Sequence, residues 1–193
     1  MKLANPAPLG LFGFALTTWL LSMINAGWLP ATGMGMVLGM AFAFGGTAQF
    51  AAGLLEAPRG NTFGFVAFCA YGAFWWSFAL FVVFFGKGVP AAMVGWYLFI
   101  WGVFTFAMWI GTFVLSRATF LVFLALWITF MLLAFGAWSG VAWLTHLGGY
   151  AGLLTAIFAA YVGAADVINE VTARTVLPVG LRVARADTQG IIR

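Results

Sequence analysis

Residues 9–28 read LGLFGFALTTWLLSMINAGW, a run that holds no charged side chain. An α-helix needs about 20 consecutive, mostly apolar residues to cross the hydrocarbon core of a bilayer. Five more stretches of this kind follow, at residues 33–55, 62–85, 91–115, 118–138 and 141–165. The six stretches predict an all-α membrane protein with six transmembrane helices per protomer. We expect a multi-pass protein of the cell membrane, inner or plasma.

The composition excludes an ordinary soluble domain. Of 193 residues, 65% are hydrophobic and 6% are charged, whereas soluble domains carry about 25% charged residues. The net charge of +4 does not indicate nucleic-acid binding, because the basic side chains lie outside the apolar stretches, in the connections and at the two ends of the chain. Cys69 is the single cysteine and lies inside the third stretch, so we expect no intrachain disulfide and no metal or cofactor.

The basic side chains predict the orientation. With six spans both termini lie on the same side, and that side holds every basic residue except Lys87, namely Lys2, Arg59, Arg117, Arg174, Arg182, Arg185 and Arg193. Because Lys and Arg accumulate on the cytoplasmic side, both termini are predicted to be cytoplasmic. The chain then divides into a cytoplasmic N-terminal segment (1–8), a transmembrane bundle (9–171) and a basic cytoplasmic tail (172–193) that gives an orientation signal near the lipid headgroups.

Glycines predict where helices pack. Gly35 and Gly39 are spaced four residues apart, and so are Gly148 and Gly152. Helices in lipid associate by close packing at small residues. Both pairs therefore predict sites where two helix backbones approach closely, and they specify packing rather than function.

The first stretch carries a polar stripe. Its members fall at positions i, i+3, i+4, i+7 and i+11, which share one helix face, and they are Phe14, Thr17, Thr18, Leu21 and Asn25. Hydroxyls, an amide and an aromatic ring on one face indicate a pore lining. The alternative is that the two threonine hydroxyls donate to carbonyls of their own helix. Asn25 on the same stripe favours the lining.

Two further polar side chains lie inside apolar stretches. Gln49 shares a face with Gly46 and Gly53, and an amide in a groove of glycines suggests a polar binding position. Tyr71 lies in an aromatic stripe of the third stretch, where a buried phenol needs a hydrogen-bonding partner.

The predicted pathway is neutral. No Lys, Arg, Asp or Glu falls near the middle of a stretch, and Glu56, Asp166 and Glu170 lie at the predicted cytoplasmic ends. A carboxylic acid titrates at a pKa of about 4.3, so its neutral form is a small minority at neutral pH. An apolar constriction penalises the bare anion through desolvation. Such a path suits a weak acid that crosses with its proton, or another small solute that binds weakly.

The triplet Asn5-Pro6-Ala7 precedes the first stretch. Aquaporins need two such motifs that meet at mid-membrane, so we reject an aquaporin. Asn is a good N-cap and Pro suits the first turn of a helix. The triplet therefore predicts a stiff helix start at the cytoplasmic mouth, where free N–H groups suit a carboxylate.

Longer motifs resemble those of the acetate uptake transporter family, whose members include succinate–acetate permeases. The most specific is the string Asn5-Pro-Ala-Pro-Leu-Gly-Leu11. Five more blocks occur in the family's order, and they are Gly45-Gly-Thr-Ala-Gln49, Gly60-Asn-Thr-Phe-Gly64, Tyr71-Gly-Ala-Phe-Trp75, Trp101-Gly-Val-Phe-Thr105 and Arg174-Thr-Val-Leu-Pro-Val-Gly180. The resemblance covers nearly the whole chain.

The resemblance implies a six-helix protomer in a homo-hexamer, with one pathway per protomer. It implies uptake of acetate, and in some members succinate, coupled to protons, although a channel-like mode has also been argued for the family. By matching motifs, the family's narrow constriction falls on Phe14, Tyr71 and Leu126. The polar family positions near the substrate fall on Asn5, Thr17, Thr18 and Gln49, and Asn25 is added from the stripe.

The function predicted from the sequence is proton-coupled transport of small carboxylates through a neutral pathway with an aromatic constriction. The alternatives are a passive channel for acetate and a pore for another small solute, ammonia or water. A membrane enzyme that uses Ser139 with His146 is a further alternative, as is a purely structural protein. The incomplete motif around Ser139 argues against the enzyme, and the polar stripe argues against the structural protein.

Overall fold

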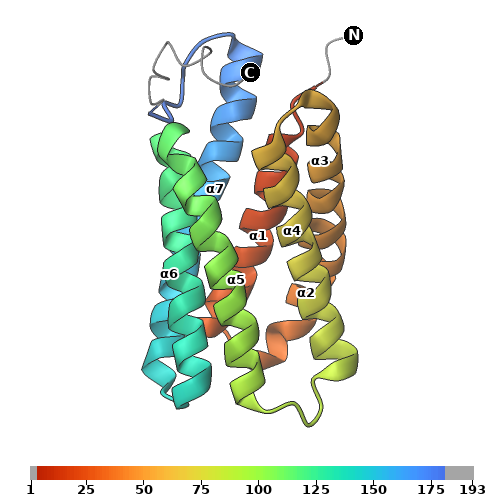
Figure 1. Cartoon of the computed structure of the whole chain (residues 1–193), viewed down its shortest axis with the longest axis vertical. Coiled ribbons are helices and arrows are strands. Elements are labelled where there is room, and N and C mark those ends of the chain that lie inside the picture. Colours follow the sequence, from red (N-terminus) through yellow and green to blue (C-terminus); the bar gives the residue numbers. More distant parts are fainter. Residues whose placement is uncertain (1–3, 181–193) are drawn as a thin grey trace, which may run out of the picture.

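A computed structural model describes residues 4–180, and all regular structure in this range is helical. Figure 1 shows long helices side by side in one bundle, with the start of α1 and the end of α7 at the same end. The α-helices are α1 (Ala7–Asn25), α2 (Met34–Phe42), α3 (Gln49–Glu56), α4 (Thr62–Leu80), α5 (Ala91–Gly111), α6 (Arg117–Ser139) and α7 (Ala142–Thr172). Within the described residues, six spans are long and apolar enough to cross a membrane, which confirms the prediction.

Short irregular helices join or extend the α-helices. They are η1 (Ala31–Gly33), η2 (Ala43–Ala48), η3 (Ala57–Arg59), η4 (Phe81–Phe85) and η5 (Thr112–Val114). We call the end of the bundle where α1 begins and α7 ends the terminal end. We call the other end, with the connections 26–33, 86–90 and 140–141, the distal end (Figure 1).

The second span, Ala31–Arg59, is interrupted by a wide π-type turn, η2, between α2 and α3. At the start of this turn the carbonyl of Phe42 accepts a hydrogen bond from the Thr47 hydroxyl at 2.7 Å and one from the Trp76 indole N–H at 3.3 Å. An unpaired backbone group is costly in hydrocarbon. These two side chains therefore add hydrogen bonds to an irregular turn in the middle of the second span.

Local signals in the sequence set several helix ends. The Asn61 side-chain oxygen accepts from the Gly64 N–H at 3.0 Å and caps α4, and the Ser116 hydroxyl does the same for α6 through the Thr119 N–H at 3.0 Å. Gly140 ends α6 in a left-handed conformation, with φ of 67°. The connections between the spans are short.

Close glycine contacts join α1 to α7 and α6 to α7. A Cβ atom on Gly152 would collide with the Ser22 hydroxyl of α1, and one on Gly148 would lie 2.6 Å from the side chain of Leu133 on α6. This confirms the packing predicted for that pair. The prediction for Gly35 and Gly39 is wrong within the chain, because a Cβ on either would meet no described atom within 4 Å. These two glycines face away from the other helices.

Large apolar side chains cover the outside of the bundle. On α5, Trp96 is 54% exposed, Ile100 58% and Ile110 51%. Water would penalise such a surface, whereas a bilayer is its natural solvent. The exposed face of α5 therefore fits a transmembrane bundle.

The segment after α7 folds back onto the bundle at the terminal end. The Asn169 side-chain oxygen accepts from the N–H groups of Val176 at 2.7 Å and Leu177 at 2.9 Å. The first N–H groups of α6 donate to the carbonyls of Val179 and Gly180. The first part of the predicted tail is thus bound to α6 and α7. The rest of the tail, with Arg182, Arg185 and Arg193, lies outside the described residues, as does Lys2.

Candidate functional site

A cavity of about 500 Å³ lies among α1, α4, α5 and α6. On the helices that start at the terminal end, its lining begins at Phe14 on α1, Phe74 on α4 and Leu126 on α6. Toward the distal end the lining includes Val89 and Met93, beside the connection between α4 and α5. The cavity therefore occupies the distal half of the bundle and ends near the middle of the spans.

None of the described residues that line the cavity is charged. Apolar and aromatic side chains make up most of the wall, and its polar members are Thr18, Ser22, Asn25, Tyr97, Thr129 and Thr145. Several of these are already hydrogen-bonded: the Tyr97 and Ser77 hydroxyls lie 2.6 Å apart, and Thr129 donates to the Ala125 carbonyl at 2.8 Å. The neutral character predicted for the pathway is thus present in the cavity.

The three residues predicted to form the constriction lie in one buried cluster at the inner end of the cavity. Phe14, Tyr71 and Leu126 are all nearly inaccessible, and the rings of Phe14 and Tyr71 have centroids 5.7 Å apart. Phe14 and Leu126 line the cavity, whereas Tyr71 does not line it and packs against the Phe14 ring. The Tyr71 and Thr105 hydroxyls are 2.9 Å apart, so the phenol has the partner that burial requires. We call these three residues the throat.

The stripe predicted on α1 divides into two faces. Phe14, Thr18, Leu21 and Asn25 line the cavity, and we call them the cavity face. Thr17 does not line it: its hydroxyl donates to the Gly13 carbonyl at 2.8 Å, and its side chain fills the space that Gly45 leaves. The alternative, that a threonine hydroxyl donates to a carbonyl of its own helix, therefore describes Thr17 and not Thr18. Gly10, Gly13 and Thr17 contact α3, α4 and η2, and we call them the packing face.

Gln49 lies outside the cavity. It is 1% exposed and packs against Gly13 of α1. The open groove predicted around it is wrong: Trp76 fills the space at Gly46, and the backbone and thiol of Cys69 fill that at Gly53. The reason is that α4 packs directly on these glycines. The Gln49 side-chain oxygen has no hydrogen-bond partner among the described residues.

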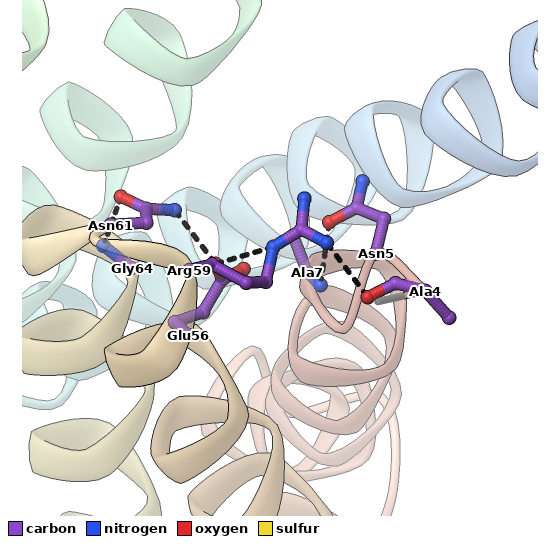
Figure 2. Close-up of polar contacts among 7 residues, drawn as sticks. All are labelled: Ala4, Asn5, Ala7, Glu56, Arg59, Asn61 and Gly64. Carbon is purple, nitrogen blue, oxygen red and sulfur yellow. Dashed lines mark hydrogen bonds and ion pairs between the residues drawn. The ribbon is translucent and has the colours of Figure 1, made fainter. Parts of the chain in front are cut away.

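Asn5 lies at the terminal end, far along α1 from the cavity face. Its side-chain oxygen accepts from the Ala7 N–H at 3.2 Å, as Figure 2 shows. Pro6, rather than Asn5, occupies the N-cap position. Asn5 therefore stabilises the start of α1 from the position before the N-cap, and not from the N-cap itself as predicted.

Trp75 is a cavity residue that the sequence predicts only as a member of the aromatic stripe with Tyr71 and of a family motif. Its indole N–H is buried and lacks a hydrogen-bond partner among residues 4–180, and so does the hydroxyl of Thr18. Both residues line the cavity. Buried polar groups are nearly always paired, so these two unpaired groups beside one cavity are candidates for a hydrogen bond to a ligand or water. The available signal was an indole inside an apolar stretch, which needs an acceptor when buried.

Ser139 is already used in the end of α6. Its hydroxyl donates to the Phe135 carbonyl at 2.6 Å and accepts from the Val141 N–H at 3.3 Å. A serine nucleophile instead needs a base within hydrogen-bond reach. The local geometry does not favour the membrane-enzyme alternative.

The helical fold and its exposed apolar surface define an integral, multi-pass membrane protein. Residues 1–181 match the model of the GPR1/FUN34/yaaH family, and the chain belongs to this family. This confirms the resemblance found in the sequence motifs.

Three relatives show how close the similarity is. The succinate-acetate/proton symporter SatP of Escherichia coli (strain K12) is 44% identical over 183 residues, covering 93% of this chain and 96% of the relative. Ammonia transport outward protein 2 of Saccharomyces cerevisiae is 40% identical over 169 residues, 83% of this chain and 60% of that protein. A solved structure of the bacterial acetate channel SatP matches with a TM-score of 0.89 and 43% identity, over 93% of this chain and 100% of the other. These relatives are transport proteins and not enzymes, as predicted for this chain.

Proposed function

We propose that the chain carries small carboxylates, acetate first and succinate in addition, across the membrane together with protons. The observation that carries this proposal is the chemistry of the cavity: an uncharged lining with two unpaired polar groups, on Thr18 and Trp75, above an apolar throat. The substrates named for the symporter and the channel that this chain resembles support the same substrate class.

The cavity suits a carboxylate that is held weakly. The Trp75 N–H can only donate, and the Thr18 hydroxyl can donate or accept, so both can bond a carboxylate oxygen. Without a fixed cation the bond is of ordinary strength, about 0.5–1.5 kcal/mol net. Weak binding lets the solute leave again, which a transport pathway needs.

The apolar throat explains why a proton would cross together with the carboxylate. Phe14 and Leu126 offer no hydrogen-bonding side-chain atom, so a bare anion would lose its hydration there without compensation. The neutral acid loses far less. We therefore assign the throat residues Phe14, Tyr71 and Leu126 to gating, and Thr18 and Asn25 to contacts with the solute before it reaches them. Asn5, Thr17 and Gln49 lie outside the cavity and would meet the solute only if the pathway opens past the throat.

We also infer cytoplasmic termini, residence in the inner or plasma membrane, and assembly into a homo-hexamer. The positions of Arg59, Arg117 and Arg174 at the terminal end support the orientation. The open side of Gly35 and Gly39 and the exposed face of α5 leave room for neighbouring copies. Native mass spectrometry from detergent measures the number of copies directly, and a monomer would contradict the hexamer.

The test of transport is uptake of labelled acetate by liposomes that contain the purified protein. We expect uptake above that of empty liposomes, faster when the outside is acidic. Uptake should be accompanied by alkalinisation of the outside medium, which an external pH dye records. Acetate uptake equal to that of empty liposomes would contradict the proposal, and uptake without proton movement would leave a passive acetate channel.

Ammonia is a second candidate solute, because one relative is named for ammonia transport and the uncharged cavity does not exclude a neutral base. The two candidates differ in competition. If the cavity binds carboxylates, acetate should slow ammonia movement through the protein. Ammonia movement that acetate leaves unchanged, in a protein that moves no acetate, would favour the ammonia pathway.

A further inference from the structure

A second hollow lies at the terminal end of the bundle, apart from the cavity described above. It has a volume of about 450 Å³ and lies between α6, α7 and the segment 173–180 that follows α7. Figure 1 shows the segment after α7 crossing toward the start of α6, to which it is hydrogen-bonded. The described residues that line this hollow and those that line the first cavity are different. We call the second hollow the α6–α7 groove.

The segment that closes the groove is held by hydrogen bonds from both helices. On α7, the Tyr161 hydroxyl donates to the Pro178 carbonyl at 2.8 Å, and the Asn169 amide donates to the Leu177 carbonyl at 2.9 Å. The first two N–H groups of α6 donate to carbonyls of the same segment. The groove therefore has three defined walls, two of them membrane helices.

Within residues 4–180 the groove has one charged side chain, that of Arg117. The aliphatic part of this side chain lies along the segment after α7, since a Cβ atom on Gly180 would be 3.2 Å from the Arg117 Cδ atom. The guanidinium group forms no hydrogen bond or ion pair with the rest of the described chain. A guanidinium carries five N–H donors, so Arg117 can bind an anion at the edge of the groove.

The groove changes from charged to apolar along the helix axes. Leu121 lies four residues further into α6 than Arg117, and Ile157 lies four residues before Tyr161 on the antiparallel α7. At 1.5 Å per residue, both apolar side chains start about 6 Å deeper in the span. Leu121 is 40% exposed and Ile157 44% exposed, so this part of the groove faces the outside of the bundle. A cation at the end of a span, with open apolar surface below it, matches the headgroup and acyl chains of a lipid.

We propose that the α6–α7 groove binds an anionic phospholipid. The lipid phosphate accepts hydrogen bonds from the Arg117 guanidinium, and an acyl chain lies on Leu121, Ile157 and Phe158. Arginine matches phosphate geometry with two parallel hydrogen bonds. Basic pockets between transmembrane helices bind anionic headgroups in other membrane proteins. The groove is separate from the cavity, so this role does not depend on the proposed transport function.

The first experiment measures lipid preference of the full-length protein purified in detergent. The protein is mixed with equal amounts of two lipids with identical chains, anionic dioleoyl phosphatidylglycerol and zwitterionic dioleoyl phosphatidylcholine, and native mass spectrometry counts the bound lipids. We expect about fivefold more of the anionic lipid, the effect of one basic side chain near an anionic surface. Arg117→Gln should bind both lipids equally. Arg174→Gln is the matched control, because it removes an exposed charge from the same end but not from the groove.

A second variant tests the apolar part of the groove. Leu121→Trp keeps Arg117 and places a larger ring where the acyl chain would lie, so it should reduce the binding of both lipids. The outward position of Leu121 lets the larger ring fit without disturbing the bundle, and the thermal unfolding temperature checks this. Inorganic phosphate has no acyl chain and should not displace the bound anionic lipid.

Four outcomes would overturn the proposal. Arg117→Gln could keep the preference for the anionic lipid, or Arg174→Gln could lose it to the same extent. Leu121→Trp could bind both lipids as the wild type does, or inorganic phosphate could displace the lipid, which would leave an anion site only. A groove that a second copy of the chain covers would bind neither lipid, and this result would also contradict the proposal.

Discussion

Two pairs of neighbouring residues show how this bundle separates packing from function. Thr17 and Thr18 are adjacent on α1, and Trp75 and Trp76 are adjacent on α4. Thr17 donates to the Gly13 carbonyl, and Trp76 donates to the Phe42 carbonyl and the Thr47 hydroxyl. The polar groups of Thr18 and Trp75 have no partner within residues 4–180. The residue types are identical in each pair, so the neighbouring helix decides the role.

This difference shows which polar groups are not already hydrogen-bonded within the described residues and could bond a solute. The packing face of α1 meets α3, α4 and η2 closely, and its polar atoms are used within the protein. The cavity face borders the cavity, and the buried hydroxyl of Thr18 has no partner among the described residues. Substitutions on the packing face should therefore change stability, and those on the cavity face should change transport.

The largest effect is expected from Gly13→Ala on the packing face. The new Cβ atom would lie 2.7 Å from the Phe44 carbonyl oxygen, a backbone atom that cannot move aside easily. Overpacking of this kind costs about 1–3 kcal/mol. We expect a clear fall in the thermal unfolding temperature in detergent. Gly33→Ala is the matched control, because a Cβ there would lie 3.8 Å from the Ile24 side chain, an ordinary van der Waals contact. Equal stability of the two variants would contradict the packing face.

Phe14→Ala should have the next largest effect, and it acts on the throat. Removing the ring widens the inner end of the cavity, where Phe14 meets Tyr71. We expect acids longer than acetate to pass at least about tenfold faster, which corresponds to about 1.4 kcal/mol of barrier. The measurement is uptake of labelled butyrate relative to acetate in liposomes. Leu16→Ala, on the exposed side of the same helix, should leave that ratio unchanged. An unchanged ratio in Phe14→Ala would place the constriction elsewhere.

The sequence predicts the spans well because hydropathy acts locally. A charge-free stretch of about 20 residues has few alternatives to a transmembrane helix. The cap at Asn61 and the left-handed turn at Gly140 are equally local, since each depends on a few neighbouring residues. The irregular turn η2 was not predicted, because the Phe42 carbonyl is paired by Trp76 from another helix.

The sequence predicts the site only in part, because helical periodicity gives a face but not its neighbours. The stripe on α1 spans more than one contact surface, and Gly45 on the next span determines that Thr17 is packed away. The groove predicted at Gln49 fails for the same reason, since α4 supplies the atoms that fill it. The sequence does not show which of Trp75 and Trp76 is hydrogen-bonded, because the partners of Trp76 lie on another span.

The tryptophan pair gives a sharper test of the comparison. Trp75→Phe removes an unpaired donor from the cavity, and we expect the half-saturating acetate concentration to rise about fivefold, near 1 kcal/mol. Trp76→Phe removes two hydrogen bonds that stabilise η2. Trp76→Phe should lower the unfolding temperature and leave the half-saturating acetate concentration unchanged. Competition of acetate with its labelled form measures the first quantity. If Trp76→Phe raised the half-saturating acetate concentration and Trp75→Phe only lowered the unfolding temperature, the role of Trp75 would be refuted.

The threonine pair repeats this test with a smaller change in shape. Thr18→Val keeps the side-chain size but removes the free hydroxyl, so acetate binding should weaken by about threefold, or roughly 0.7 kcal/mol. Thr17→Val removes a hydrogen bond to the helix's own backbone and should leave acetate binding unchanged. The double variant of Thr18 and Trp75 should be less than additive if both groups bond the same solute. Strict additivity would indicate two separate contacts.

The smallest effect is expected from Ser139→Ala, which tests whether a satisfied hydroxyl outside the cavity has any role in transport. Ser139 is exposed, and its hydrogen bonds serve the end of α6. We expect a loss of about 0.5 kcal/mol in stability at most, with acetate uptake unchanged. A fluorophosphonate should not label the wild-type protein, because the hydroxyl donates to a carbonyl and not to a base. If the wild-type protein is labelled and Ser139→Ala is not, a hydrogen-bonded hydroxyl can still be reactive in this protein. Hydrogen bonding within the protein would then no longer distinguish packing residues from functional ones.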